Sequence, residues 1–300
     1  MHFADNDVGR VVRTDFFGKG VRMGSLLVTA AGSIAACFLL FGGMSALSQE
    51  TAPTAAGMEV ASSAPVAGTE EHPLMPVIRW AERERPNIAA IQDYTAIVQK
   101  QENINGVVQG AQVMEVKIRH EPFSVYIRFR YPRNLSGQQA IFVRGQNNDR
   151  LVAHGVGLQR NFGTQKLDPE GFLAMQGNKY PITDIGILNL VDKLLEVGYR
   201  DIQFGECEVT YTENVKVGDR YCTMIQVVHP VPRRNFIFHI ARIFVDNELN
   251  MPIRYESYDW PRRPGEVPQL IEAYIYSNLR LNVGLTDADF DYKNPAYNFP

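Results

Sequence analysis

The side chains that could carry out acid–base chemistry or bind a metal are few and scattered. Four histidines are dispersed along the chain: His120, His154, His229 and His239. Glu206 and Glu208 flank Cys207 at strand spacing, so their carboxylates share one face and could transfer protons or bind a cation. No third ligand lies nearby in the sequence. We therefore interpret the glutamates as a solvated face and the histidines as structural residues.

Motifs that would assign an activity are missing from the sequence. It contains no Gly-x-Ser-x-Gly, no His-Glu-x-x-His, no Cys-x-x-Cys and no phosphate-binding loop. The 30 Lys and Arg residues nearly balance the 33 Asp and Glu residues, whereas nucleic-acid binding requires a strongly basic surface. The sequence thus predicts a non-catalytic protein that binds no metal, no cofactor and no nucleic acid.

The cysteines leave two alternatives open. Cys207 and Cys222 lie on two consecutive predicted strands and would face each other if the hairpin turned at residues 214–215. Gly218 is the stronger turn signal, and a turn there would place the two cysteines out of register. The sequence therefore allows either a Cys207–Cys222 disulfide or two buried thiols, with the thiols favoured.

The N-terminal part of the chain predicts export. Residues 23–49 contain no charged side chain, follow a basic lead-in at residues 1–22 and end in small residues. This pattern is typical of a signal peptide or membrane anchor, which we place at residues 23–48 with the lead-in in the cytoplasm. Residues 49–71 are rich in Ala, Ser, Thr and Pro and predict a disordered linker. The remainder is expected in the periplasm or cell envelope.

Three outcomes are open for the apolar segment. Cleavage after Ser48 would release the protein, whereas retention would leave it anchored in the membrane. Residues 34–37 also resemble a lipoprotein-processing site that would lipidate Cys37, although residues 38–41 stay apolar where such sites normally become polar. The linker favours the anchored form slightly.

The body of the chain, residues 72–300, is predicted to be one domain. Apolar residues at helical spacing predict a leading helix near residues 74–81 and a second helix at residues 187–195. Alternating patterns and hairpin signals predict strands between and after them: 94–102, 108–119, 125–130, 140–144, 150–154, 207–213, 221–228, 236–245, 253–258 and 270–282.

This order predicts a mainly β (α+β) fold. Hairpin-length connections favour one antiparallel sheet of about 9–11 strands, and the twist of so many strands would curl it into a half-barrel. We expect two or three helices to cover its concave face.

Three segments resemble the bacterial outer-membrane lipoprotein carrier and receptor superfamily (LolA/LolB-like). Residues 244–254 resemble its recurring hairpin, in which a strand ending in Asp is followed by a turn and then by Met, Pro and a basic residue. Residues 218–223 resemble the strand entry one hairpin earlier, and residues 273–282 its late strand. The chain is similar above all to an exported family of unknown function within that superfamily.

The resemblance implies a hydrophobic cavity between half-barrel and helices that holds an acyl chain, a lipid or a lipoprotein. The apolar residues expected to line it are Ile127, Phe129, Ile187, Leu188, Val191, Leu195, Phe238 and Ile275. The alternative is that these residues are ordinary core. A second hypothesis is a membrane-tethered sensor or scaffold for an envelope protein partner, and a third is an enzyme built on the same cavity.

Two proline-bracketed basic loops complete the candidate sites. Arg233 and Arg234 lie in one loop, and Trp260, Arg262 and Arg263 lie in the other. They could contact lipid headgroups or an acidic partner at the rim, or be solvated loop charges. Trp260 could equally contact a membrane interface or pack on its own turn.

Overall fold

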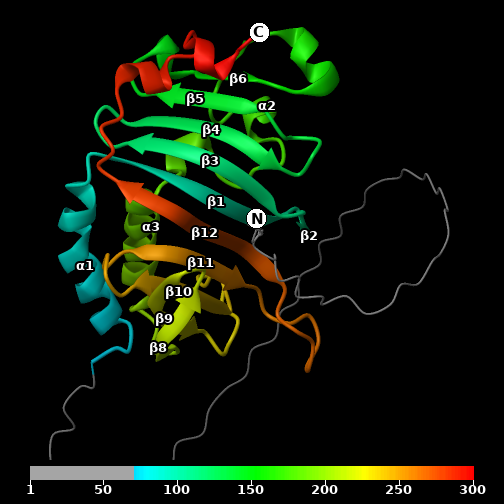
Figure 1. Cartoon of the computed structure of the whole chain (residues 1–300). Helices are drawn as coiled ribbons and strands as arrows, with labels where there is room; N and C mark the ends of the chain where they lie inside the picture. Colours follow the sequence, from blue (N-terminus) through cyan, green and yellow to red (C-terminus); the bar gives the residue numbers. More distant parts are fainter. Residues whose placement is uncertain (1–70) are drawn as a thin grey trace, which may run out of the picture. The chain divides into compact units, whose positions relative to one another are not determined.

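The computed structural model describes residues 71–300, which form a single antiparallel sheet with helices on one face (Figure 1). The sequence-based predictions for the lead-in, the apolar segment, Cys37 and most of the linker lie outside the described residues. Within residues 71–300, no helix is both long and apolar enough to cross a membrane.

The sheet contains twelve strands. They are β1 (Asp93–Ile104), β2 (Val107–Val108), β3 (Gln112–Arg119), β4 (Ser124–Tyr131), β5 (Gln139–Val143), β6 (Leu151–His154), β7 (Gln165–Leu167), β8 (Glu208–Val217), β9 (Arg220–Val228), β10 (Ile240–Asp246), β11 (Pro252–Tyr258) and β12 (Leu270–Leu281). The strand order is β7-β6-β5-β4-β3-β1-β12-β11-β10-β9-β8, and β2 pairs with β1 alone. The predicted fold class is confirmed. The strand predicted at residues 108–119 is divided into β2 and β3, and β7 is a short strand that the alternation pattern did not predict.

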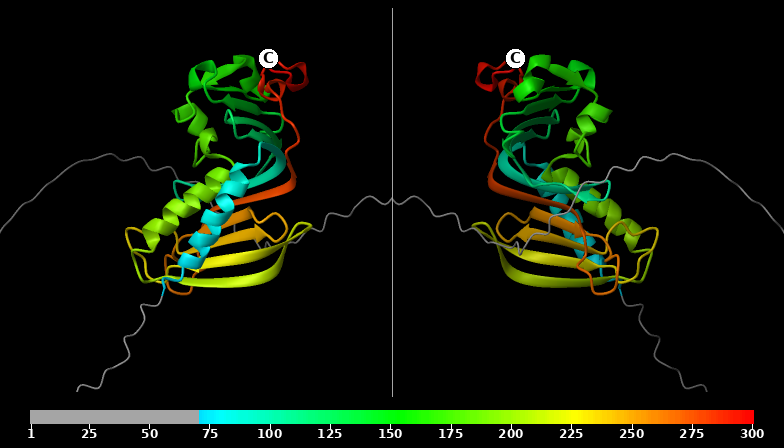
Figure 2. Two further views of the ribbon diagram at one scale, coloured as in Figure 1. Left: turned by 90° about the vertical axis from the view of Figure 1, so that its left-hand side faces the viewer. Right: turned by 90° about the vertical axis from the view of Figure 1, so that its right-hand side faces the viewer.

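Three α-helices and five 3₁₀ turns complete the described chain. The α-helices are α1 (Met75–Ala89), α2 (Phe172–Met175) and α3 (Ile187–Asp201). The 3₁₀ turns are η1 (Asn147–Asp149), η2 (Gly157–Phe162), η3 (Ile182–Asp184), η4 (Asp287–Phe290) and η5 (Pro295–Tyr297). Helices α1 and α3 lie across the concave side of the curved sheet (Figure 2).

Close approach at two glycines fixes α3 between the sheet and α1. A Cβ at Gly198 would lie 3.1 Å from Ile78 of α1, so the absence of a side chain lets the two helices cross closely. Gly186, just before α3, has φ of +124° and lies beneath the Tyr94 hydroxyl, which accepts a hydrogen bond from the Ile187 amide at 3.0 Å. The start of α3 is therefore held against β1.

One predicted strand begins later than expected. The alternation at residues 236–245 predicted a strand throughout, but β10 starts at Ile240. Phe236 stacks on the buried His229 ring at 3.8 Å between centroids, and Phe238 packs on the same ring. The apolar residues of this segment thus pack around a histidine in the β9–β10 connection instead of pairing in the sheet.

The two hairpin motifs of the sequence contact each other. Arg220, at the start of β9, donates two hydrogen bonds of 2.5 and 2.8 Å to Asp246, at the end of β10. Asp246 is fully buried and also accepts the backbone amides of Glu248 and Leu249, both at 2.9 Å. Charge-assisted bonds of this kind fix the tight turn after β10. The motif residues therefore have a structural role.

The C-terminal segment covers the convex face of the sheet, which the sequence patterns did not predict. Tyr126 of β4 stacks on Tyr297 of η5 at 4.2 Å between ring centroids. Lys117 of β3 donates to Asp289 of η4 at 2.7 Å and to the Tyr297 hydroxyl at 3.0 Å. Figure 1 shows this segment in red beside β4 and β5. Both faces of this part of the sheet are thus covered.

A buried histidine connects the sheet to this segment. Gln139 donates to Nε2 of His154 at 3.1 Å and to the Tyr297 carbonyl at 2.6 Å, so Nε2 must be unprotonated. His154 Nδ1 then donates to the Gly155 carbonyl at 2.9 Å. Burial, reinforced by the charge of Arg160, holds the pKa of His154 below its ordinary value of 6.5. The folded protein binds a proton at His154 less readily than the unfolded chain does.

We predict that acid destabilises the domain partly through His154. Its contribution to the free energy of unfolding is complete above about pH 6.5, near the ordinary histidine pKa, and is lost as the pH falls below that value. The pKa values of His120 and His229 are lowered by burial as well, so the His154→Gln variant should retain part of the acid sensitivity. Urea unfolding at about pH 7.5 and about pH 5.5 measures the difference. An equal loss in wild type and variant would contradict the prediction.

Candidate functional site

A cavity of about 580 Å³ lies between the concave face of the sheet and the helices. Ten neighbouring strands contribute to its lining, from β7 at one edge of the sheet to β9 near the other. Helices α1 and α3 and the segment around α2 line its other side. The lining thus spans most of the width of the curved sheet, across the direction of the strands.

The lining is mainly aliphatic and aromatic. On the β3–β7 side it includes Met114, Ile127, Phe129, Ala140, Leu151 and Leu167. On the β9–β11 side it includes Val227, Phe238, Ala241, Ile243 and Tyr255. A cavity of this size and composition falls in the usual range of small-molecule sites, about 300–1,000 Å³.

The structure divides the eight predicted lining residues into two groups. Ile127, Phe129, Leu195 and Phe238 line the cavity. Ile187 and Val191 do not, because they lie on the side of α3 that packs on the sheet, where they are 2% and 1% exposed. Leu188 packs against the same core cluster. The structure thus places these three residues in or against the core cluster and not in the cavity lining.

Ile275 also lies outside the cavity lining, and the reason is instructive. Alternation along β12 places Ile271, Ala273 and Ile275 on one face, and this apolar set was expected to face the helices. The cavity is instead lined by Glu272, Tyr274 and Tyr276. The two tyrosines supply the apolar surface on this face. Period-two alternation thus identified the residues that share a face but did not identify the inner face.

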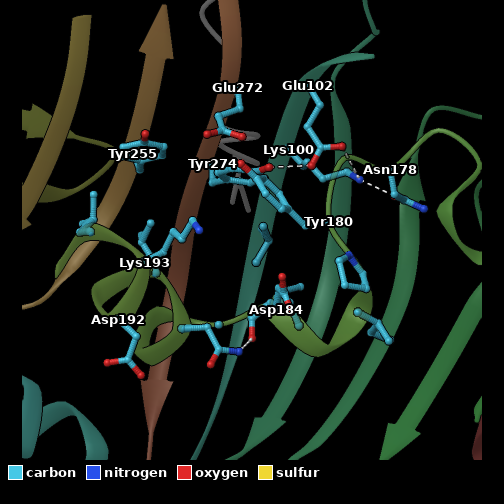
Figure 3. Close-up of a pocket in the computed structure, with 18 of the residues that line it drawn as sticks. Lys100, Glu102, Asn178, Tyr180, Asp184, Asp192, Lys193, Tyr255, Glu272 and Tyr274 are labelled. Atoms are coloured by element: carbon cyan, nitrogen blue, oxygen red, sulfur yellow. Dashed lines mark hydrogen bonds and ion pairs between the residues drawn. The ribbon is translucent and has the colours of Figure 1, made fainter. Parts of the chain in front are cut away.

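A group of polar side chains lines the cavity at the adjoining ends of β1 and β12, and we call it the polar cluster (Figure 3). Its members are Lys100 and Glu102 from the end of β1, Glu272 and Tyr274 from the start of β12, and Asn178, Lys179 and Tyr180 from the segment before α3. All but Lys179 are lining residues. Apolar lining continues on both sides of the cluster.

Hydrogen bonds join the three segments within the polar cluster. The Tyr274 hydroxyl donates to Glu102 Oε1 at 2.6 Å, and the Lys179 amide donates to Glu102 Oε2 at 3.0 Å. Lys100 Nζ donates to Asn178 Oδ1 at 2.5 Å and lies 3.2 Å from Glu102. Burial lowers the pKa of Lys100, partly opposed by Glu102. Burial and the charges of Glu272 and Glu102 raise the pKa of Tyr274.

Two carboxylates of the cluster are direct cross-strand neighbours. The register of β1 and β12 places Glu102 opposite Glu272, and the two residues are 4% and 5% exposed. Like charges directly opposite each other on a sheet are destabilising, and each carboxylate has a lysine as counterion. Lys179 Nζ lies 2.9 Å from Glu272 Oε2, but this oxygen has no partner in hydrogen-bonding geometry.

Sequence reasoning missed the polar cluster, although a signal was present. Tyr94, Ala96 and Val98 occupy alternate positions of β1, and Lys100 and Glu102 continue the same face. Two charges that extend an apolar face predict either the end of burial or a buried polar site. The burial of Glu102 shows that the second applies.

The basic loops lie at the same end of the strands as the polar cluster but do not line the cavity. Arg233 pairs with Glu206, Arg234 is exposed, Arg262 donates to Gln269 at 3.3 Å, and Arg263 lies 3.6 Å from Glu266. Trp260 is half-buried and donates to the His229 carbonyl at 3.1 Å. It therefore packs on the neighbouring β9–β10 connection, an arrangement that neither sequence alternative described. A role in headgroup or partner contact stays a prediction.

The described residues provide no group of three His, Cys, Asp or Glu side chains placed to hold a metal ion. Glu206 is half-buried, Glu208 is exposed, and neither lines the cavity. A second buried pair lies at the far end of α3, where His229 Nε2 is 3.6 Å from Asp201 Oδ2. Asp201 borders the cavity there.

Cys207 and Cys222 are both free, so the disulfide alternative is wrong for this structure. The hairpin turns at Gly218, and Cys222 faces Val215 in the register of β8 and β9. Cys207 lies just before β8, beyond its pairing with the end of β9. The second alternative, two buried thiols, matches the structure.

Comparison with known proteins gives one family match. A family model described as protein of unknown function (DUF1571) matches residues 91–299. The comparison with curated proteins finds no match. The family match confirms the expectation of a family of unknown function.

Solved structures with similar chains include a LolA superfamily protein of Nitrosomonas europaea (12% identity, TM-score 0.30, covering 70% of this chain and 97% of that chain). The lipoprotein LppX of Mycobacterium tuberculosis is 10% identical, with a TM-score of 0.41 and coverage of 72% and 100%. A chain of the MucA/MucB complex of Pseudomonas aeruginosa is 12% identical, with a TM-score of 0.40 and coverage of 72% and 60%. These values are low, so we derive the function from the cavity itself.

We predict that both buried thiols are inert until the protein unfolds. Burial raises the pKa of Cys207 to about 12 and that of Cys222 to about 11, so almost no reactive thiolate exists at neutral pH. In a Cys37→Ser chain without reductant, a thiol-alkylating reagent should add no label in buffer and two labels in denaturant. Mass spectrometry counts the labels. An unreduced, denatured chain that takes up none would indicate a disulfide.

Proposed function

The chain belongs to the DUF1571 family of proteins of unknown function, and we propose that it binds the acyl chain of a lipid or lipoprotein in the cavity, without catalysis. The observation that supports this proposal is the cavity of about 580 Å³ and its mainly apolar lining, to which ten strands contribute. A hydrocarbon chain can fill such a space by apolar contact alone, without the directed polar groups that a polar ligand needs. The resemblance of the hairpin motifs to lipoprotein carriers agrees with this function.

The energetics are adequate for reversible binding. Each methylene group removed from water contributes about 0.8 kcal/mol, so about ten buried methylene groups contribute about 8 kcal/mol. The loss of translational and rotational freedom offsets several kcal/mol of this gain. Binding by apolar contact alone would therefore be weaker than micromolar, and polar contacts at the headgroup would add affinity.

We further propose that the protein acts in the cell envelope. This rests on the apolar segment at residues 23–48 and the linker at 49–71, which would hold the domain near a membrane surface. An anchored domain with an acyl-chain cavity would act as a fixed station, and a domain released after Ser48 would act as a soluble carrier.

An exposed apolar surface favours a second candidate, a sensor or scaffold that binds an envelope protein. Four large apolar side chains of η2 and α2 are exposed: Leu158 (85%), Phe162 (74%), Phe172 (82%) and Leu173 (64%). Leu158 and Phe162 belong to one 3₁₀ turn and Phe172 and Leu173 are consecutive in the chain, and contiguous exposed apolar residues commonly mark an interaction surface. Under this hypothesis a stoichiometric protein partner should co-purify, and serine substitutions at these positions should release it.

The lipid proposal predicts that full-length protein, extracted gently from membranes of the producing cells, carries bound lipid. Native mass spectrometry would detect it as an added mass that is lost on denaturation. The Ala140→Trp variant should lose most of this lipid, because Ala140 lines the cavity and an indole there would occupy part of its volume.

Ala90→Trp is the matched control, since Ala90 is exposed at the end of α1 and lies outside the lining. It should retain the wild-type amount of lipid. Wild-type protein that is ligand-free and does not take up lipid from vesicles would exclude the proposed function.

A further inference from the structure

The polar cluster has the composition of a headgroup site. Resting on the proposed acyl-chain binding, we propose that it receives the headgroup of a zwitterionic amphiphile, one that carries both an ammonium and an anionic group. The ammonium would contact the two carboxylates of the cluster, and the anionic group would contact its two lysines. Acyl chains would then extend along the apolar lining on either side.

The cluster lies on β1 and β12, near the middle of the ten strands that line the cavity. The lining on one side continues through β3 to β7 and on the other through β12 to β9, with the cluster on the adjoining ends of β1 and β12. An amphiphile whose polar group occupied the cluster could therefore bury hydrocarbon in both directions. A cluster at the outer end of the cavity would accommodate apolar chains on one side only.

The charges of the cluster balance one another. The cluster holds two lysines and two glutamates, so its formal charge is zero. Ionised groups in a poorly solvated site are costly unless they are paired. An anionic or cationic headgroup would leave one charge without a counterion. A zwitterion can exchange partners with a lysine–glutamate pair, so that every charge is paired before and after binding.

A contribution to stability alone does not explain the cluster. Apolar residues of similar volume often stabilise a fold as well as a buried ion pair does, and here two carboxylates face each other across neighbouring strands. Glu272 Oε2 keeps an acceptor position without a hydrogen-bond donor although it is buried. Its counterion Lys179 has a side chain that is 28% exposed and lies on a connecting segment. This pair can therefore open toward a ligand without disturbing the sheet.

The test compares two phospholipids with identical acyl chains. Full-length protein is incubated with vesicles of equimolar dioleoyl phosphatidylethanolamine, which is zwitterionic, and dioleoyl phosphatidylglycerol, which is anionic. The protein is then re-isolated, and the bound lipids are quantified by mass spectrometry. Wild type should be enriched in the zwitterionic lipid by about tenfold, the ratio expected for one unpaired charge-assisted hydrogen bond.

Two variants change the charge of the cluster in opposite directions. Glu272→Gln leaves it with a charge of +1 and should shift the bound ratio toward the anionic lipid. Lys179→Met leaves it with a charge of −1 and should shift the ratio further away from that lipid. Glu248→Gln is the matched control, because this carboxylate is 80% exposed and outside the cavity lining, and it should give the wild-type ratio.

The outcomes separate this proposal from the proposed function. Lipid bound in the vesicle ratio by wild type and all variants would overturn the headgroup proposal but leave acyl-chain binding intact. Failure of every protein, including wild type, to bind lipid would overturn both. Lipid returned in hydrolysed form would identify the carboxylates as catalytic and would also overturn the headgroup proposal. Opposite shifts in the two charge variants would support it.

Discussion

The width of the sheet, relative to the helices that cover it, determines most of this structure. Eleven strands side by side span about 48 Å before curvature, whereas a helix of fifteen residues is about 22 Å long. Twist accumulated over so many strands curls the sheet, and the concave face becomes larger than α1 and α3 can fill. The helices close the centre, where Ile187 and Val191 pack on the sheet. The remaining space is the cavity.

Local patterns in the sequence predicted where strands and helices form, but they did not predict which of their side chains line the cavity. Alternation located β1, β4 and β12, and helical spacing located α3. Alternation did not identify the inner face of β12. Tyrosine has both apolar and polar character, so the pattern could not show that Tyr274, and not Ile275, faces the cavity. On α3, one stripe contains both Val191 in the closed core and Leu195 in the cavity lining. That distinction depends on sheet curvature, which no local pattern encodes.

The site was harder to predict than the fold because its residues are distant in the sequence. Glu102 and Glu272 become neighbours only through the pairing of β1 with β12, and Asn178, from a segment without periodicity, contacts Lys100. The aromatic residues of the C-terminal segment were missed for the same reason, since Tyr297 of the short turn η5 contacts Tyr126, which is distant in the sequence. By contrast, the sequence patterns did single out the motifs that contain Arg220 and Asp246, and the hydrogen bond between these residues shows that they stabilise a turn.

The central pairing of β1 with β12 also affects the order of folding. Among the paired strands of the sheet, β1 and β12 are the farthest apart in the sequence. Strands β3 to β7 lie on one side of this pair, and strands β11 to β8 lie on the other. Contacts between distant residues form slowly because a long loop must close first. The edge of β1 therefore stays unpaired until almost the whole chain has been synthesised, and an unpaired edge readily joins other strands. The polar cluster is assembled in this last step, so a chain truncated before β12 would lack both the site and the protection of that edge.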